Sequence, residues 1–170
     1  MKRPFTLEMG GSKPVQAFIQ RAMDMGMPWC PDLNVPEPFG VCGSAYNIKE
    51  GLRQSTTVAY LDPARSRPNL TIISEALVLS LKLSGRRVEG VTYQKNGETI
   101  TANADRVVLS AGAYHSPQVL TLSGIGPAAE LARLGIEATH VLEGVGQNYQ
   151  DHATVQMTYE GRDDFSPDWV

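Results

Sequence analysis

Residues 104–126 hold the pattern that most constrains the fold: an apolar strand, a turn of small residues and a helix. The segment 104–112 (ADRVVLSAG) is typical of a strand buried on both faces, because its apolar residues are consecutive rather than alternating. A turn of small residues follows, and Ser116 and Pro117 predict the N-cap and the first position of a helix. This order of elements favours an α/β fold.

The turn after this strand could approach a ligand. Gly112 has no Cβ, so the phosphate or ribose of a nucleotide could come close to the backbone. The start of the next helix offers unpaired N–H groups and positive potential to an anion. These features indicate a nucleotide near residues 110–117. A tight turn with ordinary packing and no ligand is an equally weighted interpretation of the same residues.

Short strands are predicted on both sides of this region. Segments 69–73 (NLTII) and 76–83 (ALVLSLKL) are rich in apolar residues, and 86–94 (RRVEGVTYQ) alternates, with Val91 and Tyr93 on one face. Asn96-Gly97 is a strong hairpin signal before a returning strand, and together these segments predict a β-meander. Further along, the pattern predicts a helix over 127–134 that stops at Gly135, a short strand over 137–142 and another strand over 153–160.

The first third of the chain is expected to be the least regular. Ser12 predicts the cap of a helix that stops at Gly26, with apolar residues at helical spacing: Val15, Phe18, Ile19 and Ala22. Residues 27–43 are dense in proline and glycine and predict a long loop. Ser55 predicts the cap of a short helix through Leu61.

Composition excludes several classes of function. The chain has 170 residues, 42% of them apolar, and a net charge of -3, which disfavours nucleic-acid or membrane-surface binding. It contains no 18-residue apolar run and no signal-like start, so a cytoplasmic location is expected.

Cys30 and Cys42 fit neither a redox pair nor a zinc pattern, and we expect plain thiols, with a disulfide as the alternative. The histidines have no metal-ligand spacing, so no metal is expected.

Residues 110–126 and 144–152 closely resemble the glucose–methanol–choline (GMC) oxidoreductase family. The family pattern G-A-x-x-S-P-x-[aliphatic]2-x2-S-G-I-G is matched at every fixed position from Gly112 to Gly126. Segments 51–72 (GLRQSTTVAYLDPARSRPNLTI) and 84–93 (SGRRVEGVTY) also look like family motifs, as does the stretch 14–28. The resemblance spans nearly the whole chain.

The resemblance implies a flavoenzyme that binds FAD and takes a hydride from a small-molecule alcohol. It places three residues at the cofactor: Val78, whose backbone would bond the adenine, and the pair Ala111 and Gly112. His152 would lie near the substrate cavity, although a loop histidine bonded only to backbone is the other interpretation. His115 and His140 are expected at the surface or in packing. The oligomeric state stays open.

Two departures from the family pattern bear on cofactor binding, catalysis and substrate. The G-x-G-x-x-G dinucleotide loop and the family's catalytic histidine pair are not found, so no catalytic residue is assigned in this chain. We therefore expect an internal fragment that alone neither holds FAD tightly nor turns over. The alternative is a non-catalytic module acting in binding or assembly. Thr154 stands where choline-oxidising members of the family have a glutamate, which favours an uncharged alcohol over choline.

The expected architecture is α/β: a partial Rossmann-like FAD-binding domain with its β-meander, joined to pieces of a substrate-binding domain. Residues 1–68 are assigned to an irregular substrate-side segment with two short helices. Residues 69–152 are assigned to the partial FAD-binding domain, and 153–170 to the start of a substrate-domain sheet. Exposed apolar surface is expected wherever the family's other segments would pack.

Overall fold

The computed structural model describes residues 13–43, 46–156 and 158. Contacts between Cα atoms divide the chain into two compact units. One unit comprises Met1–Thr71 together with Gln156–Val170, and the other comprises Ile72–Val155. The second unit contains every residue that the sequence assigns to the cofactor. The boundaries predicted for three domains stay predictions.

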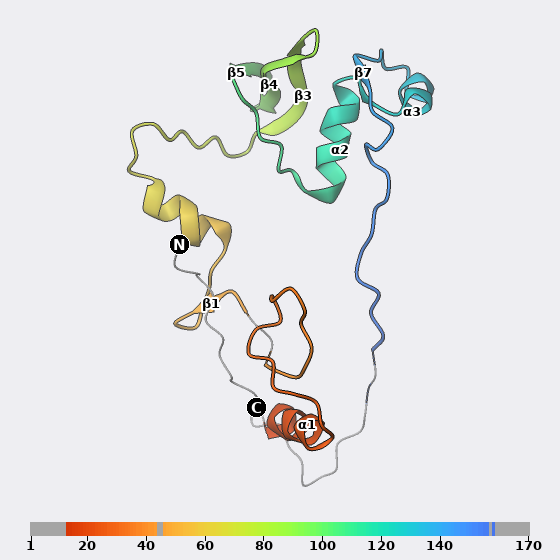
Figure 1. Ribbon diagram of the computed structural model, residues 1–170. Coiled ribbons are helices and arrows are strands. Elements are labelled where there is room, and N and C mark those ends of the chain that lie inside the picture. The colour runs from red at the N-terminus through yellow and green to blue at the C-terminus, as the bar shows by residue number, and fades with distance from the viewer. Residues whose placement is uncertain (1–12, 44–45, 157, 159–170) are drawn as a thin grey trace. The chain divides into compact units, whose positions relative to one another are not determined.

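The first unit opens with helix α1, Lys13–Asp24 (Figure 1). The predicted helix is confirmed, and its predicted cap Ser12 lies outside the described residues. Gly26 has φ 92, and its N–H donates to the carbonyl of Met23 at 2.9 Å, which ends the helix as its sequence predicts. No residue of α1 is buried: Val15 and Phe18 of its apolar stripe are exposed, and Ile19 and Ala22 are half-buried.

Residues 27–43 form a loop closed by backbone bonds. The N–H of Cys30 donates to Val41 at 3.1 Å, and the N–H of Val41 donates to Pro28 at 2.9 Å. Cys30 and Val41 are the buried residues of this unit in the described part of the chain. Cys30 and Cys42 are both free thiols, which confirms the first of the two interpretations of the cysteines.

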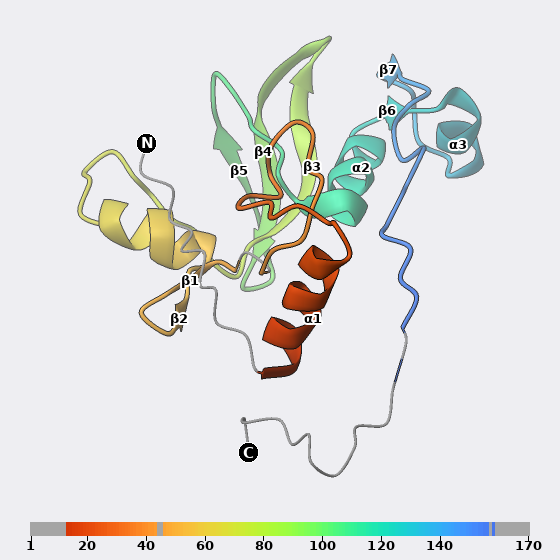
Figure 2. The same cartoon turned by 60° about the horizontal axis from the view of Figure 1, so that its bottom comes forward.

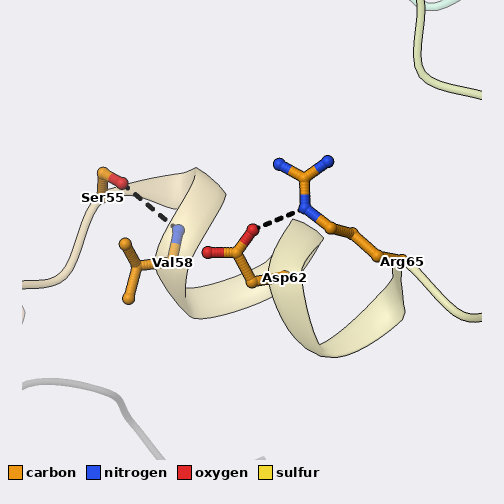
Figure 3. Close-up of polar contacts among 4 residues, drawn as sticks. All are labelled: Ser55, Val58, Asp62 and Arg65. Carbon is orange, nitrogen blue, oxygen red and sulfur yellow. Dashed lines mark hydrogen bonds and ion pairs between the residues drawn. The ribbon is translucent and has the colours of Figure 1, made fainter.

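A hairpin of strands β1, Ile48–Lys49, and β2, Leu52–Arg53, precedes the short helix that Ser55 was expected to cap. Figure 3 shows the Ser55 hydroxyl accepting a bond from the N–H of Val58 at 3.3 Å. The helix, η1, runs over Thr57–Leu61 and is a π-helix rather than an α-helix, because the N–H of Asp62 reaches back five residues. A 3₁₀ turn, η2, follows over Asp62–Ala64, where Arg65 pairs with Asp62 at 2.7 Å.

The second unit is built on the predicted meander. Strands β3 (Leu77–Ser84), β4 (Arg87–Lys95) and β5 (Glu98–Asn103) form an antiparallel sheet in that order. Asn96 and Gly97 have φ values of 52 and 82, the positive pair that a tight type I′ hairpin requires. Tyr93 of β4 is buried and Val91 is half-buried, so the face that they share points toward the interior.

Helix α2 lies beside β3 in both Figure 1 and Figure 2, and it spans Gly112–Leu122. After it, strand β6 (Ile125–Gly126) pairs in parallel with β7 (His140–Val141) around the short helix α3 (Ala128–Arg133). The helix predicted before Gly135 is thus confirmed. The predicted short strand is also confirmed, but it is shorter than the predicted range 137–142. The core of this unit gathers where these elements meet, at Val119, Leu131 and Val145.

Two predicted strands are absent from the described residues. Residues 69–73 and 104–110 are irregular, and Val108 is 88% exposed. The consecutive apolar residues suit a central parallel strand, and such a strand exists only with neighbours to bond on both edges. The described part of the chain supplies no strand beside either segment. Of the strand predicted over 153–160, residues 153–156 are irregular and the remainder lies mostly outside the described residues.

The start of α2 also differs from the prediction. The helix begins at Gly112, four residues before the predicted cap Ser116, and Pro117 lies inside it. The Ser116 hydroxyl accepts a bond from the N–H of Ala111 at 3.0 Å, so it reaches back across the first turn instead of capping a later start. Pro117 removes the N–H that would bond the carbonyl of Ala113, and the helix continues without that bond.

Candidate cofactor site

The backbone of Gly112 is exposed within the predicted cofactor site. Gly112 has φ +85, and a Cβ built on it would meet no atom within 4 Å. Ala111 beside it is also exposed. At the start of α2 the unpaired N–H groups carry partial positive charge, which favours an anion such as a phosphate. This geometry fits the approach of a nucleotide phosphate or ribose to the backbone.

Val78 lies on strand β3, the edge strand of the meander that faces α2. It pairs with Tyr93 of β4, and a register shift between Val78 and Ser80 marks an irregularity in the ladder. An edge strand keeps one row of backbone groups unpaired by its neighbour. Val78 thus lies on a strand with one open edge, and its contact with the adenine stays a prediction.

A groove of about 1030 Å³ begins immediately after Gly112. Its walls are residues of α2 between Ala113 and Leu120 and the loop from Leu142 to Gln150. No residue that lines it carries a charge. The groove therefore suits uncharged groups and backbone contacts rather than a second ionic site.

Two tyrosines face each other across this groove. The hydroxyls of Tyr114 and Tyr149 lie 2.8 Å apart, and the ring centroids are 5.1 Å apart with an interplanar angle of 30°. The hydrogen bond to Tyr114, reinforced by partial desolvation, raises the pKa of the Tyr149 phenol above its ordinary value. The bond between the two hydroxyls fastens the loop to α2.

The loop beyond the groove is organised by its own side chains, as expected for such residues. Asn148 has φ 54 and its side chain accepts a bond from the Gln150 amide at 2.7 Å, while Asp151 accepts from the N–H of His152 at 2.7 Å. The His152 side chain is exposed and lies two residues past the end of the groove lining. The structure does not bring it to Ala111 or Gly112 as part of one cluster.

The remaining histidines also follow the prediction. His115 is exposed on α2, and His140 is half-buried on β7, where its Nδ1 lies 3.2 Å from Nη2 of Arg86. Within the described ranges, no group of three or more histidine, cysteine or acidic side chains could hold a metal ion. None of the described helices has the length and apolar character to cross a membrane.

Sequence reasoning missed two features of this site. One is the tyrosine pair, whose members are 35 positions apart and have no sequence pattern in common. The other is the bond between the Ser123 hydroxyl and the N–H of Leu81 at 2.8 Å, which ties α2 to β3. The sequence did hold a signal for the Ser123 bond, because Ser123 is a fixed residue of the family motif that ends at Gly126.

Curated relatives agree with the motifs in the sequence. Oxygen-dependent choline dehydrogenases of Staphylococcus aureus, in strains JH9 and Newman among others, are 40% identical to this chain over 167 residues. The match covers 96% of this chain and 29% of those proteins. The chain thus spans less than a third of the length of the curated relatives that it matches.

Solved structures agree with the fold. Pyridoxine 4-oxidase from Mesorbium loti superposes with a TM-score of 0.71 at 32% identity, over 79% of this chain and 26% of that protein. An FAD-dependent oxidoreductase from Chaetomium thermophilum gives 0.70 at 28% identity, over 78% of this chain and 24% of that protein. The family model described as GMC oxidoreductase matches residues 8–154, which is most of the sequence. The chain belongs to the GMC oxidoreductase family.

Proposed function

We propose that this chain is part of a flavin-dependent oxidoreductase that takes a hydride from the CH–OH group of a small-molecule alcohol. FAD, when bound, supplies the hydride acceptor. The single observation that carries the cofactor assignment is the open backbone of Gly112 at the start of α2, with φ +85 and free space where a Cβ would stand. Family membership and the FAD-dependent solved relative support the same cofactor.

In this proposal each predicted residue binds through its backbone. Ala111 and Gly112 let the cofactor approach the start of α2, where the helix dipole favours the phosphate charge. Val78 bonds the adenine from the edge of β3. Because the contacts are made by backbone, the side chain of Val78 is free to pack, and a conservative change there is expected to alter packing more than binding.

For the substrate we propose an uncharged alcohol. Thr154 offers no negative charge to pair with a quaternary ammonium group, and a cation without a counter-charge loses most of its electrostatic attraction. The choline dehydrogenase relatives point toward choline instead. Replacing Thr154 by Glu in a protein that carries the complete family fold is the deciding test. A gain in choline affinity supports the uncharged substrate, and no gain contradicts it.

The cofactor site is tested by titrating the chain with FAD while recording backbone amide NMR signals. We expect shifts at Val78, Ala111 and Gly112. Shifts confined to other residues would contradict the assignment. We also expect no flavin to remain bound through purification, because the dinucleotide loop of the family is not in this sequence.

A matched pair of variants separates cofactor contact from backbone strain. Gly112 and Gly97 have φ values of +85 and +82, and neither would bring a Cβ within 4 Å of another atom. Replacing either by Ala therefore imposes similar strain on the backbone. We expect Gly112→Ala to weaken FAD binding about tenfold, the equivalent of one lost hydrogen bond, and Gly97→Ala to leave it unchanged. Equal effects would contradict a contact at Gly112.

The proposal also covers the division of the chain into domains, its location and its activity when alone. We propose that residues 69–152 are the chain's share of the FAD-binding domain, flanked by substrate-side residues 1–68 and 153–170. The proposed location is the cytoplasm. The chain alone is expected not to turn over, since none of its residues is assigned as the general base that would take the alcohol proton.

A further inference from the structure

Tyr114 and Tyr149 are held as a pair by the elements that carry them. Tyr114 lies in the first turn of α2. Tyr149 follows a loop whose turn is fixed by Asn148 at φ 54 and by the buried side chain of Val145. Both tyrosines belong to the unit Ile72–Val155, so their relative position is a property of one compact body.

The geometry of the pair favours reaction between the rings. With hydroxyls 2.8 Å apart and centroids only 5.1 Å apart, the two rings lie side by side, and the edges that carry the hydroxyls are next to each other. The ring carbons ortho to the hydroxyls lie on these same edges, and they carry much of the unpaired electron density of a tyrosyl radical. The rings are tilted by 30°, and coupling requires a rotation that brings two such carbons together.

Both rings are also open to an oxidant. Tyr114 is 70% exposed and Tyr149 is 53% exposed, although they touch each other. A phenol that is hydrogen-bonded to a second oxygen can release its proton as its electron leaves, which avoids a high-energy radical cation. Exposure and pairing together distinguish these tyrosines from Tyr93, which is buried in the sheet.

We propose that Tyr114 and Tyr149 form an oxidative modification site at which a dityrosine cross-link joins helix α2 to the loop 142–150. Each phenol loses one electron and one proton, and the two radicals join through a new carbon–carbon bond between ortho positions. The two ring hydrogens then move to the oxygens and restore both phenols. The oxidant is hydrogen peroxide acting through a haem peroxidase, and it is reduced to two molecules of water.

The cross-link would close the groove wall permanently. It replaces the hydrogen bond between two exposed hydroxyls by a covalent bond between residues 35 positions apart. Like a disulfide, the cross-link would reduce the conformational entropy of the unfolded chain. The site does not depend on FAD or on the proposed alcohol substrate. Its test is therefore independent of the proposed function.

The experiment treats the dilute 170-residue chain with peroxidase and hydrogen peroxide, and isolates the monomer. Trypsin should yield peptides 107–133 and 134–162 joined to each other, with a mass two hydrogens below their sum, and with dityrosine fluorescence. Fragmentation of the joined peptides must place the bond at Tyr149 and not at Tyr159. If the isolated monomer yields no joined peptides after trypsin, the proposal is overturned.

Three comparisons make the result specific. Tyr114→Phe and Tyr149→Phe should each lose the joined peptides, while Tyr60→Phe, at a tyrosine that is 56% exposed, should keep them at full yield. Circular dichroism checks that the variants fold as the parent does. In concentrated urea the parent should lose most of the product, because only the fold holds the rings together. An unchanged yield in Tyr149→Phe or in urea would contradict the proposal.

Discussion

The hydroxyl of Ser123 accepts a hydrogen bond from the backbone N–H of Leu81 at 2.8 Å and donates to the carbonyl of Val119 at 2.6 Å. Leu81 lies on β3, so one side chain ties the end of helix α2 to the edge of the meander. Ser123 is itself buried. The serine of the family motif thus holds the helix against the strand on which Val78, a proposed cofactor residue, also lies.

Replacing Ser123 by Ala should lower the free energy of unfolding by about 1–3 kcal/mol. The change leaves the N–H of Leu81 without its partner in a half-buried place, where an unpaired N–H group costs desolvation free energy. Urea unfolding followed by circular dichroism measures the loss. Ser84→Ala is the control, because Ser84 is exposed at the end of β3 and should change stability by less than about 0.5 kcal/mol. A Ser123 variant as stable as this control would show that the bond contributes nothing.

Gly124 and Gly126 of the same motif should respond very differently to Ala. Gly124 has φ +76, and its Cβ would stand 2.6 Å from both the carbonyl of Glu137 and the hydroxyl of Thr139. We expect Gly124→Ala to cost about 2–4 kcal/mol from strain and overlap together. Gly126→Ala is the matched control, because its nearest contact is an ordinary 3.6 Å. Thermal unfolding of both variants tests this difference, and equal melting temperatures would contradict it.

Local signals predicted the fold well where partners are close in sequence. The Asn96-Gly97 turn and its alternating strands need only each other, and Gly26 and Gly135 end their helices by their own backbone freedom. The strand expected over residues 104–112 failed for the opposite reason. Its apolar run describes a strand between distant neighbours, and the described residues contain none beside it.

The candidate site was predictable to a similar extent. The motif marked the backbone at Gly112 because its glycine and its place before a helix are local features. The start of α2 was misplaced, since Ser116 can cap a helix that begins after it or bond back to Ala111, and the sequence favours neither. The tyrosine pair depends on how a loop folds back onto α2, and no local pattern carries that information.

The Glu130 carboxyl should titrate below its ordinary range because of Arg133. The guanidinium holds both carboxylate oxygens, at 2.9 and 2.6 Å, and this hydrogen bonding lowers the pKa of Glu130. The pair contributes stability above the pKa of the unfolded carboxyl, and loses it as pH falls through the lower folded value. NMR titration should show the pKa of Glu130 rising in Arg133→Gln and staying low in Arg65→Gln. No rise in the first variant would contradict the pairing.

The Tyr149 phenol should titrate above the ordinary tyrosine range, and Tyr114 should be the reason. The hydrogen bond between the two hydroxyls favours the protonated form, so it raises the pKa of Tyr149. A folded pKa above the unfolded value means that the bond's contribution to stability is complete below the unfolded pKa. That contribution is lost as pH rises through the folded value.

The measurement is a spectroscopic pH titration of phenolate absorbance, with Tyr149 assigned by its loss in Tyr149→Phe. In Tyr114→Phe the pKa of Tyr149 should fall toward the ordinary value, because the second hydroxyl is gone while the ring remains. Tyr60→Phe should leave it raised. If the pKa of Tyr149 is the same with and without the Tyr114 hydroxyl, the bond between α2 and the loop does not form in solution, and the proposed cross-link loses its geometric basis as well.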